Sequence, residues 1–157
     1  MSQPAQFLIF YLEGQRYAIP LERVVRIVRA VEVTPLPGAP GGVLGVIDVE
    51  GQVFPVLSMR HRLALARKPV GPTDHLLFAR TSRRTVALVI DHPEDVLELS
   101  ATEVVGASEI MPGLDQIKGV AMLNDGVVLI HDLDRLLSLE EESALDRAME
   151  KEVSHAN

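Results

Sequence analysis

Short segments that alternate apolar and polar residues, separated by turns rich in Gly, Pro or Asp, occupy most of the chain and predict a mainly β fold. Four hairpins are expected, over residues 7–19, 43–57, 75–90 and 117–130. Each has a short polar connector at its centre, and Asn124-Asp125-Gly126 is among the stronger local hairpin signals in the chain. A further strand is expected over 96–99.

The segments that follow the first two hairpins carry helix signals. Pro20 suits the first position of a helix, because its fixed φ is already helical. Val24, Ile27 and Val28 then fall on one face at helical spacing, so a short helical segment is expected here. Ser58 is a suitable cap for a second short helix over 59–65.

The C-terminal segment predicts a helix from Leu139 to about Val153. Residues 138–141 read Ser-Leu-Glu-Glu, a capping box that opens a helix. Leu145, Met149 and Val153 share one face on an acidic background. We expect this helix to dock through that face and to be solvated elsewhere.

Two of the hairpins align without gaps at an offset of 74 residues, which favours an internal repeat. Gly45 then matches Gly119, Val56 matches Ile130, and Met59 matches Leu133. Another hairpin precedes each, so the pattern indicates two related β-rich halves of about 70 residues. The alternative is that amphipathic hairpins look alike by patterning alone. The Pro- and Gly-containing stretch near 66–74 is the expected join between the halves.

Composition narrows the class of protein. The 157 residues are 47% hydrophobic and 24% charged, ordinary values for a globular domain, and the net charge is −7. An acidic chain with four Phe, two Tyr and no Trp is a poor candidate for nucleic-acid binding, so no nucleic-acid partner is expected. The absence of Cys excludes disulfides, thiolate catalysis and cysteine-ligated metals.

The sequence predicts neither a membrane segment nor a secretory signal. No apolar run approaches the roughly 20 residues that cross a bilayer. The N-terminus also lacks a basic segment followed by an apolar one. We therefore expect a cytoplasmic protein without direct membrane insertion.

No group of residues has the spacing of a catalytic or metal site. The five histidines are not paired with each other or with a carboxylate in a zinc-type pattern, and there is no phosphate loop or Gly-x-Ser-x-Gly elbow. Asp91 and Asp95 form a candidate carboxylate pair, but a solvated turn at a strand end is the favoured interpretation. We therefore expect a binding protein with no enzymatic activity, no metal and no cofactor.

Five short motifs occur in a fixed order along the chain. They are 10–24, 35–40 leading into 43–51, 53–60, 89–91 with 95–97, and 117–120 leading into 128–133. One of them, residues 43–51, reads Val-Leu-Gly-Val-Ile-Asp-Val-Glu-Gly. Each motif is weak alone, but their collinear order from Phe7 to Leu137 is specific, and in that order they resemble the chemotaxis coupling protein CheW family.

The resemblance implies a fold and a role. The fold is two five-stranded, SH3-like β-barrels that share a hydrophobic interface, with short helices and a C-terminal helix. The role is a noncatalytic scaffold that couples the cytoplasmic tip of a chemoreceptor (methyl-accepting chemotaxis protein) to the regulatory domain of a CheA-type histidine kinase. The expected organisation is a tail over 1–6, a CheW-like domain of two intertwined halves over 7–138, and an acidic helix and tail over 139–157.

The chain departs from the family at two charged positions. Where the family hairpin reads Gly-Val-Ile-Asn-Leu-Arg-Gly, this chain has Asp48 and Glu50 in place of the Asn and the Arg. Where the family commonly carries Val-x-Glu-Ile, this chain has Arg26. An Arg and a Glu have thus exchanged places, either as a coupled pair that reverses the field presented to a partner or as two independent surface changes.

The resemblance places the receptor- and kinase-binding surface on the first half of the chain. The expected contact residues are Val24, Arg26, Ile27, Gly45, Val46, Ile47, Asp48, Val49 and Glu50. One alternative is a coupling protein of a dedicated non-flagellar pathway, with a pilus, cyclic-dinucleotide or developmental output and an altered receptor specificity. A less favoured alternative is a β-barrel that binds a small ligand.

Overall fold

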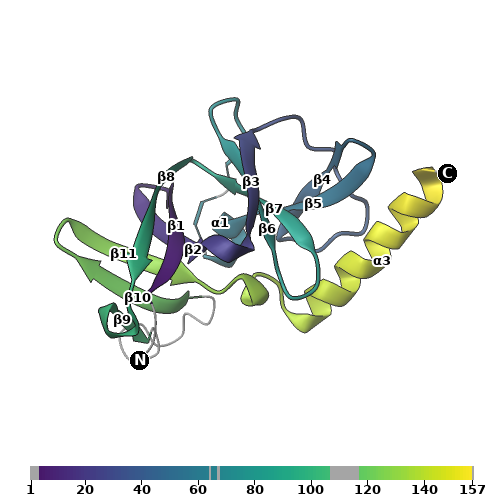
Figure 1. Ribbon diagram of the computed structural model, residues 1–157. Helices are drawn as coiled ribbons and strands as arrows, with labels where there is room; N and C mark the ends of the chain where they lie inside the picture. Colours follow the sequence, from purple (N-terminus) through teal and green to yellow (C-terminus); the bar gives the residue numbers. More distant parts are fainter. Residues whose placement is uncertain (1–3, 64, 67, 107–116, 157) are drawn as a thin grey trace.

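The computed structural model describes residues 4–63, 65–66, 68–106 and 117–156, and it is mainly β, with two sheets and few helices (Figure 1). Barrel 1 has the strand order β3-β6-β7-β5-β4. Its strands are β3 (Val24–Arg29), β4 (Val43–Val49), β5 (Gln52–Leu57), β6 (His75–Arg80) and β7 (Thr85–Ile90).

Barrel 2 has the strand order β8-β1-β2-β11-β10-β9. Its strands are β1 (Ala5–Leu12), β2 (Gln15–Pro20), β8 (His92–Leu99), β9 (Val104–Gly106), β10 (Ile117–Leu123) and β11 (Gly126–His131). The predicted fold class of two SH3-like subdomains is confirmed, although barrel 2 has a sixth, three-residue strand. The helices are η1 (Leu21–Arg23), α1 (Met59–Arg62), η2 (Ala101–Glu103), η3 (Leu133–Arg135) and α3 (Leu139–Ala156).

The two barrels exchange hairpins. Each repeat begins and ends with a hairpin, with β3 between the two hairpins in the first repeat and β8 and β9 between them in the second. Hairpin β1–β2 of the first repeat lies in barrel 2, and β6–β7 of the second lies in barrel 1. The exchanged hairpins make equivalent parallel contacts, β2 with β11 and β7 with β5. The first repeat ends with β5 and the second begins with β6, so the stretch 66–74 remains the expected join between the two halves of the sequence. The chain crosses between the barrels at two other places, η1 and Asp91.

The predicted repeat is visible in the burial of β4 and β10, which lie at an offset of 74 residues. Both strands have the same pattern, in which a buried residue, an exposed residue and three buried residues are followed by exposed and half-buried positions. Both also carry a bulge at the same place, between Val43 and Gly45 and between Ile117 and Gly119. Both strands pair with their neighbouring strand in the same way, so the same positions face the interior in each. This explains why the sequence pattern repeats.

Three apolar clusters hold the fold together. Ile9, Ala18 and Val128 belong to the interior of barrel 2, and Val56 and Phe78 to that of barrel 1. The largest cluster lies between the barrels and takes the opposite faces of the exchanged hairpins, together with parts of η3 and α3. Its members from the hairpins are Leu8, Phe10, Leu12, Tyr17, Ile19, Leu77, Ala79, Val86, Leu88 and Ile90. The expected shared hydrophobic interface is therefore present.

The prediction of a helical segment that includes Val24, Ile27 and Val28 after Pro20 is wrong. Only η1 is helical, and Val24, Ile27 and Val28 lie in strand β3, which pairs with β6. Four β-branched residues in this stretch favour a pleated strand, and pairing with a buried neighbour outweighs the helical spacing of three of them. Strand β3 is one edge of barrel 1.

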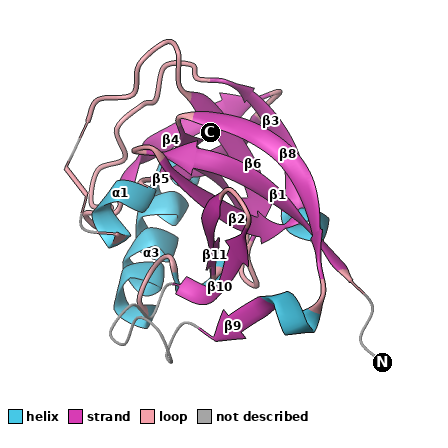
Figure 2. Cartoon of the chain, turned by 90° about the vertical axis from the view of Figure 1, so that its left-hand side faces the viewer, coloured by secondary structure: helices cyan, strands magenta, loops and turns pink. Residues whose placement is uncertain are grey.

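The other two helix predictions are confirmed. Ser58 caps α1, because its side-chain oxygen accepts a hydrogen bond from the backbone N–H of His61 at 3.3 Å. The capping box opens α3: the N–H of Glu141 donates to Ser138 Oγ at 3.1 Å, and that of Ser138 to Glu141 Oε1 at 2.9 Å. Helix α3 lies beside barrel 1, and Figure 2 shows α1 and α3 on one side of the strands.

Helix α3 is more deeply involved in the core than expected. Leu145 is fully buried and Ala148 nearly so, and both belong to the cluster between the barrels, with Met149 packed against it. The side chain of Val153 lies outside the described part of the chain. Arg84 at the β6–β7 turn forms ion pairs with Glu142, at 3.8 Å, and with Asp146. The helix is therefore part of the fold rather than a loosely docked tail.

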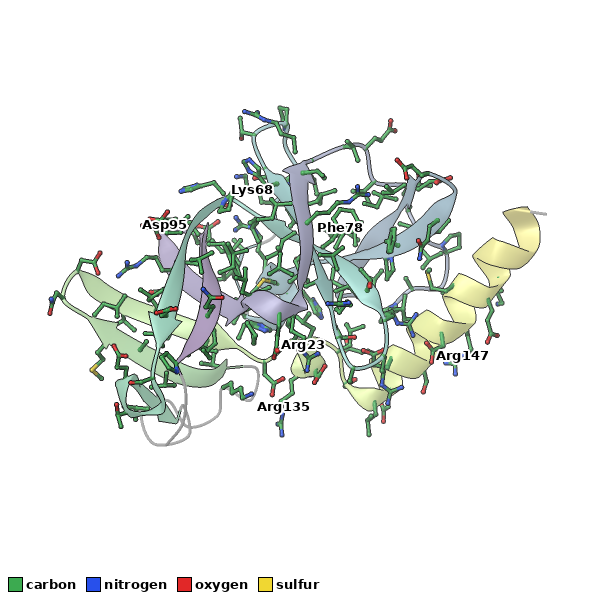
Figure 3. The ribbon with its side chains drawn as sticks, viewed as in Figure 1. Arg23, Lys68, Phe78, Asp95, Arg135 and Arg147 are labelled. Atoms are coloured by element: carbon green, nitrogen blue, oxygen red, sulfur yellow. The ribbon has the colours of Figure 1, made fainter. Side chains whose placement is uncertain are left out.

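We expect Leu145→Ala to lower the free energy of unfolding by about 2–4 kcal/mol, since it removes a fully buried side chain from the central core. Arg147→Ala, on the exposed side of the same helix (Figure 3), is the matched control and should change it by less than about 0.5 kcal/mol. Urea denaturation measures both. Equal small effects would show that α3 docks only superficially.

Gly45 and Gly51 of the second hairpin have different constraints. At Gly45 (φ +156°) a Cβ atom would lie 2.2 Å from the carbonyl oxygen of Thr34, so the strand can approach only without a side chain. At Gly51 (φ +88°) no atom lies within 4 Å of that position, so only the left-handed backbone is demanding.

We therefore expect Gly45→Ala to destabilise the protein by about 3 kcal/mol or more and Gly51→Ala by about 1 kcal/mol. Gly106→Ala, where there is space and no positive φ, is the control for losing a glycine. Thermal and urea denaturation of the three variants give the ranking. If Gly45→Ala unfolds at the same denaturant concentration as Gly106→Ala, the close approach to Thr34 is not a constraint.

Candidate functional site

The expected contact residues divide into a buried group and an exposed group. Gly45 is covered by Thr34, and Val46 and Ile47 are 5% and 4% exposed, so the strand face that we expected to be a contact surface is interior. Val24 and Ile27 are half-buried against the central core. Exposed side chains are left at Arg26, Asp48 and Glu50, with Val49 half-buried beside them.

Arg26 lies in strand β3 and caps an aromatic pair of barrel 1. Its guanidinium carbon is 5.3 Å from the ring centroid of Phe78, a cation–π distance. The Phe78 ring in turn meets the Phe54 ring edge to face, with centroids 5.4 Å apart. Figure 3 shows Phe78 between the strands of barrel 1. Arg26 therefore presents a positive charge at an exposed edge while its head group is held in place.

Glu50 lies in the β4–β5 turn and has a left-handed backbone. Its φ is 53° and that of Gly51 is 88°, which is the pattern of a type I′ turn. Asp48 Oδ1 accepts a hydrogen bond from the N–H of Gly51 at 2.8 Å, so Asp48 stabilises this turn. A non-glycine residue with this φ is strained by about 1 kcal/mol, so the turn presents Glu50 at a cost in stability.

Arg26 and Glu50 do not form the ion pair that a coupled exchange would suggest. Within the described residues no salt bridge joins them, and β3 and β4 are opposite edges of the same sheet. Any coupling between the two charges must therefore act through a partner that touches both.

A charged cluster at the junction of the barrels was not foreseen. Arg60 of α1 is 8% exposed and pairs with Glu13 of the β1–β2 turn and with Asp91, at 3.3 Å from its Oδ1. Asp91 also accepts the backbone N–H of Glu13 at 2.9 Å. Asp91 is therefore a structural anion where the chain crosses between barrels, not the solvated turn that we favoured. Glu13 and Asp91 lie 47 and 31 residues from Arg60 in the sequence, so no local pattern could reveal the cluster.

A second contact ties the tips of two hairpins in barrel 2. Arg16 of β2 pairs with Asp125 of the β10–β11 turn at 3.1 Å, and Gln15 donates to the carbonyl of Val127 at 3.1 Å. The hydrogen bond that Arg16 donates to the Asp125 carboxylate lowers the pKa of Asp125, and the same bond raises the pKa of Arg16. The ion pair therefore stabilises the folded state at pH values above the ordinary pKa of an Asp carboxyl. This stabilisation is lost as the pH falls through the lowered pKa of Asp125.

Among the described residues, buried side chains occupy the centres of both barrels. Side chains fill them: Val56, Phe78 and Ala87 in barrel 1 and Ala18, Ala121 and Val128 in barrel 2 are all at most 1% exposed. An open hollow of about 550 Å³ lies outside, where the start of β1, η1 and β8 meet, with Gln6, Glu22 and Glu98 among its walls. These observations disfavour the alternative of a small-ligand barrel.

In the part of the chain that the structure describes, no cluster of three or more His, Asp or Glu side chains has the arrangement to hold a metal ion. In the same residues no helix has both the length and the apolar composition needed to cross a membrane.

Known proteins resemble this chain in sequence and in fold. The sequence pattern of the family described as the CheW-like domain matches residues 6–141. A chemotaxis protein CheW of Klebsiella aerogenes is 27% identical over 143 residues, covering 90% of this chain and 86% of its own length. Its counterpart in Helicobacter pylori is 26% identical over 133 residues, covering 84% and 81%.

A solved structure supports the same fold. The crystal structure of the scaffolding protein TtCheW from Thermoanaerobacter tengcongensis superposes with a TM-score of 0.79 at 18% identity. The match covers 88% of this chain and 96% of that one.

We expect Arg60→Met to lower the free energy of unfolding by about 1–3 kcal/mol, because it leaves two carboxylates without their buried cation. Arg135→Met is the matched control: its ion pair with Asp132 is exposed, and its loss should cost less than about 1 kcal/mol. Urea denaturation at neutral pH compares them. Indistinguishable midpoints would mean that the charged cluster does not hold the junction.

Proposed function

The chain belongs to the CheW-like domain family of noncatalytic scaffold proteins, and on this premise we propose that it couples chemoreceptors to a CheA-type histidine kinase in chemotaxis signalling. The adaptor catalyses no reaction. It binds the regulatory domain of the kinase and the cytoplasmic tip of a receptor, and it acts in the cytoplasm at receptor arrays. The family match over residues 6–141 is the observation that carries the proposal.

The geometry of the chain supports a binding role on its outer surface. Side chains fill both barrels, so partners must be recognised by groups that point outward. Arg26 and Glu50 are such groups: both are exposed, and one is held over an aromatic ring while the other sits at a strained turn. We propose that these two charges, with Val24, Ile27 and Val49 beside them, contribute to the receptor- and kinase-binding surface.

The charge exchange relative to the family pattern favours a second candidate. An adaptor that presents Arg26 and Glu50 where relatives commonly present a Glu and an Arg would reject a receptor suited to the common polarity. Such an adaptor would serve a dedicated pathway, with a pilus, cyclic-dinucleotide or developmental output, through a receptor of matching charge.

The test is a double-mutant cycle on the affinity for the native receptor tip and for the kinase regulatory domain, by calorimetry. We expect Arg26→Glu and Glu50→Arg each to weaken receptor binding about tenfold, because a like charge then faces the partner. The melting temperature should stay nearly unchanged, since the two side chains form no ion pair with each other. The double exchange should shift preference toward receptors of the common polarity.

Glu150→Arg is the control, because it reverses an exposed charge on α3, remote from both positions in the sequence. It should leave both affinities unchanged. If the parent protein binds neither a histidine kinase nor a receptor, the adaptor role itself is wrong. If it binds both and the Arg26 and Glu50 variants bind equally well, the recognition surface lies elsewhere.

A further inference from the structure

Arg26 is held in place without being neutralised. Its guanidinium lies over the Phe78 ring, and in the described part of the chain neither a salt bridge nor a hydrogen bond engages it. Arg16, Arg60 and Arg84 are held differently, because each pairs with a carboxylate of this chain. A carboxylate offsets the charge of an arginine and occupies its donors, whereas a ring face leaves both available. Arg26 therefore keeps its charge and its N–H groups free for a partner.

The pairing of β3 with β6 brings Arg26 and Phe78 together. They are directly opposite in the antiparallel register, just after a bulge between Val24 and Arg26. Val28, two residues further along β3, packs against the interior cluster of barrel 1, so Arg26 projects from the same face of the strand. Phe78 is 1% exposed and belongs to that cluster, while Arg26 is exposed. The guanidinium therefore lies where the apolar interior of barrel 1 meets solvent.

The ring beneath Arg26 is itself fixed by its neighbours. The Phe54 ring from β5 lies 5.4 Å from that of Phe78 between centroids, with the two planes at 89°. Closely packed side chains of this kind stay in one rotamer on average. Phe78 is therefore a rigid platform for the guanidinium.

The ring suits an arginine at position 26 better than the Glu that the family commonly carries there. The face of an aromatic ring is negative, so it attracts a cation and repels a carboxylate. A Glu at this position would turn away from Phe78 toward solvent, and its charge would be mobile. The residue at position 26 is therefore matched to a core residue of barrel 1, and its exchange is more than a change of surface charge.

We propose that Phe78 is a positioning residue that sets receptor specificity through Arg26, and that the group selected is a carboxylate side chain on the receptor tip. This role rests on the adaptor function proposed above. A guanidinium held in one orientation presents its N–H groups as a fork that matches the two oxygens of a carboxylate. Less side-chain freedom is then lost when the contact forms.

The first arm of the test measures the position of Arg26 in the protein alone, by NMR relaxation of the arginine Nε–Hε groups. We expect a clearly higher order parameter for Arg26 than for Arg29, which is exposed on the same strand and has no ring contact. In Phe78→Leu the order parameter of Arg26 should fall to that of Arg29. Val56→Ala removes a buried side chain from the same cluster on another strand, so it should lower the melting temperature without freeing Arg26.

The second arm measures affinity for the native receptor tip by calorimetry. Phe78→Leu and Arg26→Lys should each weaken binding about fivefold to tenfold, because the first frees the guanidinium and the second keeps the charge without the fork. The double variant should bind no more weakly than Arg26→Lys alone, since the ring acts only through the arginine. Arg29→Lys is the matched control and should leave the affinity unchanged.

The receptor side of the contact is tested by exchanging each Asp or Glu of the tip, one at a time, for its amide. One exchange should weaken binding to the parent protein about tenfold and have little effect on binding to Arg26→Lys. Arg26→Lys leaves the core of barrel 1 intact, so this arm decides the matter even if Phe78→Leu does not fold.

Three results would overturn the proposal. The first is an Arg26 side chain that is as mobile as Arg29 in the parent protein. The second is a folded Phe78→Leu that binds as well as the parent does, or whose loss adds fully to that of Arg26→Lys. The third is a receptor tip on which no carboxylate matters. A parent protein that binds no receptor tip contradicts the adaptor function instead, and the NMR arm still decides whether Phe78 holds Arg26.

Discussion

The exchange of hairpins between the two barrels is the constraint on which the rest of the structure depends. Each exchanged hairpin, β1–β2 or β6–β7, turns one face into its own barrel and the other into the cluster between the barrels. Phe10, Ile19, Leu77 and Leu88 therefore belong to a core that the two barrels share. Neither barrel is complete without strands from the other repeat, so they should fold and unfold together.

This constraint bears on the proposed adaptor role. An adaptor that binds two partners at once needs its surfaces held in a fixed relation, and a shared core would provide this. The charged cluster of Arg60, Glu13 and Asp91 fastens the tip of one exchanged hairpin at the crossing between the barrels. The outer strands β3 and β8 consequently lie on barrels that share one core.

The sequence predicted those parts of the fold that depend on local pattern. The positions of the hairpins, both caps and the repeat of β4 in β10 follow from alternation, turn residues and capping residues that lie close together in the chain. The segment after Pro20 was assigned to a helix because the spacing of Val24, Ile27 and Val28 suits a helix as well as a strand, and only pairing with β6 decides between them. The same limit explains the crossing points and the Arg60 cluster, which depend on contacts between distant residues.

The candidate site was predictable only in part, for a related reason. The resemblance pointed to residues of β3 and of the β4–β5 hairpin, yet Val46 and Ile47 face the interior, and Asp48 is used by its own turn. Native-state hydrogen exchange tests the central claim most directly. Amides in the β2–β11 and β5–β7 pairings should exchange only by global unfolding, with one common free energy equal to that from denaturation. If one barrel exchanges at a clearly lower free energy while the other stays protected, the barrels are independent units and the account is wrong.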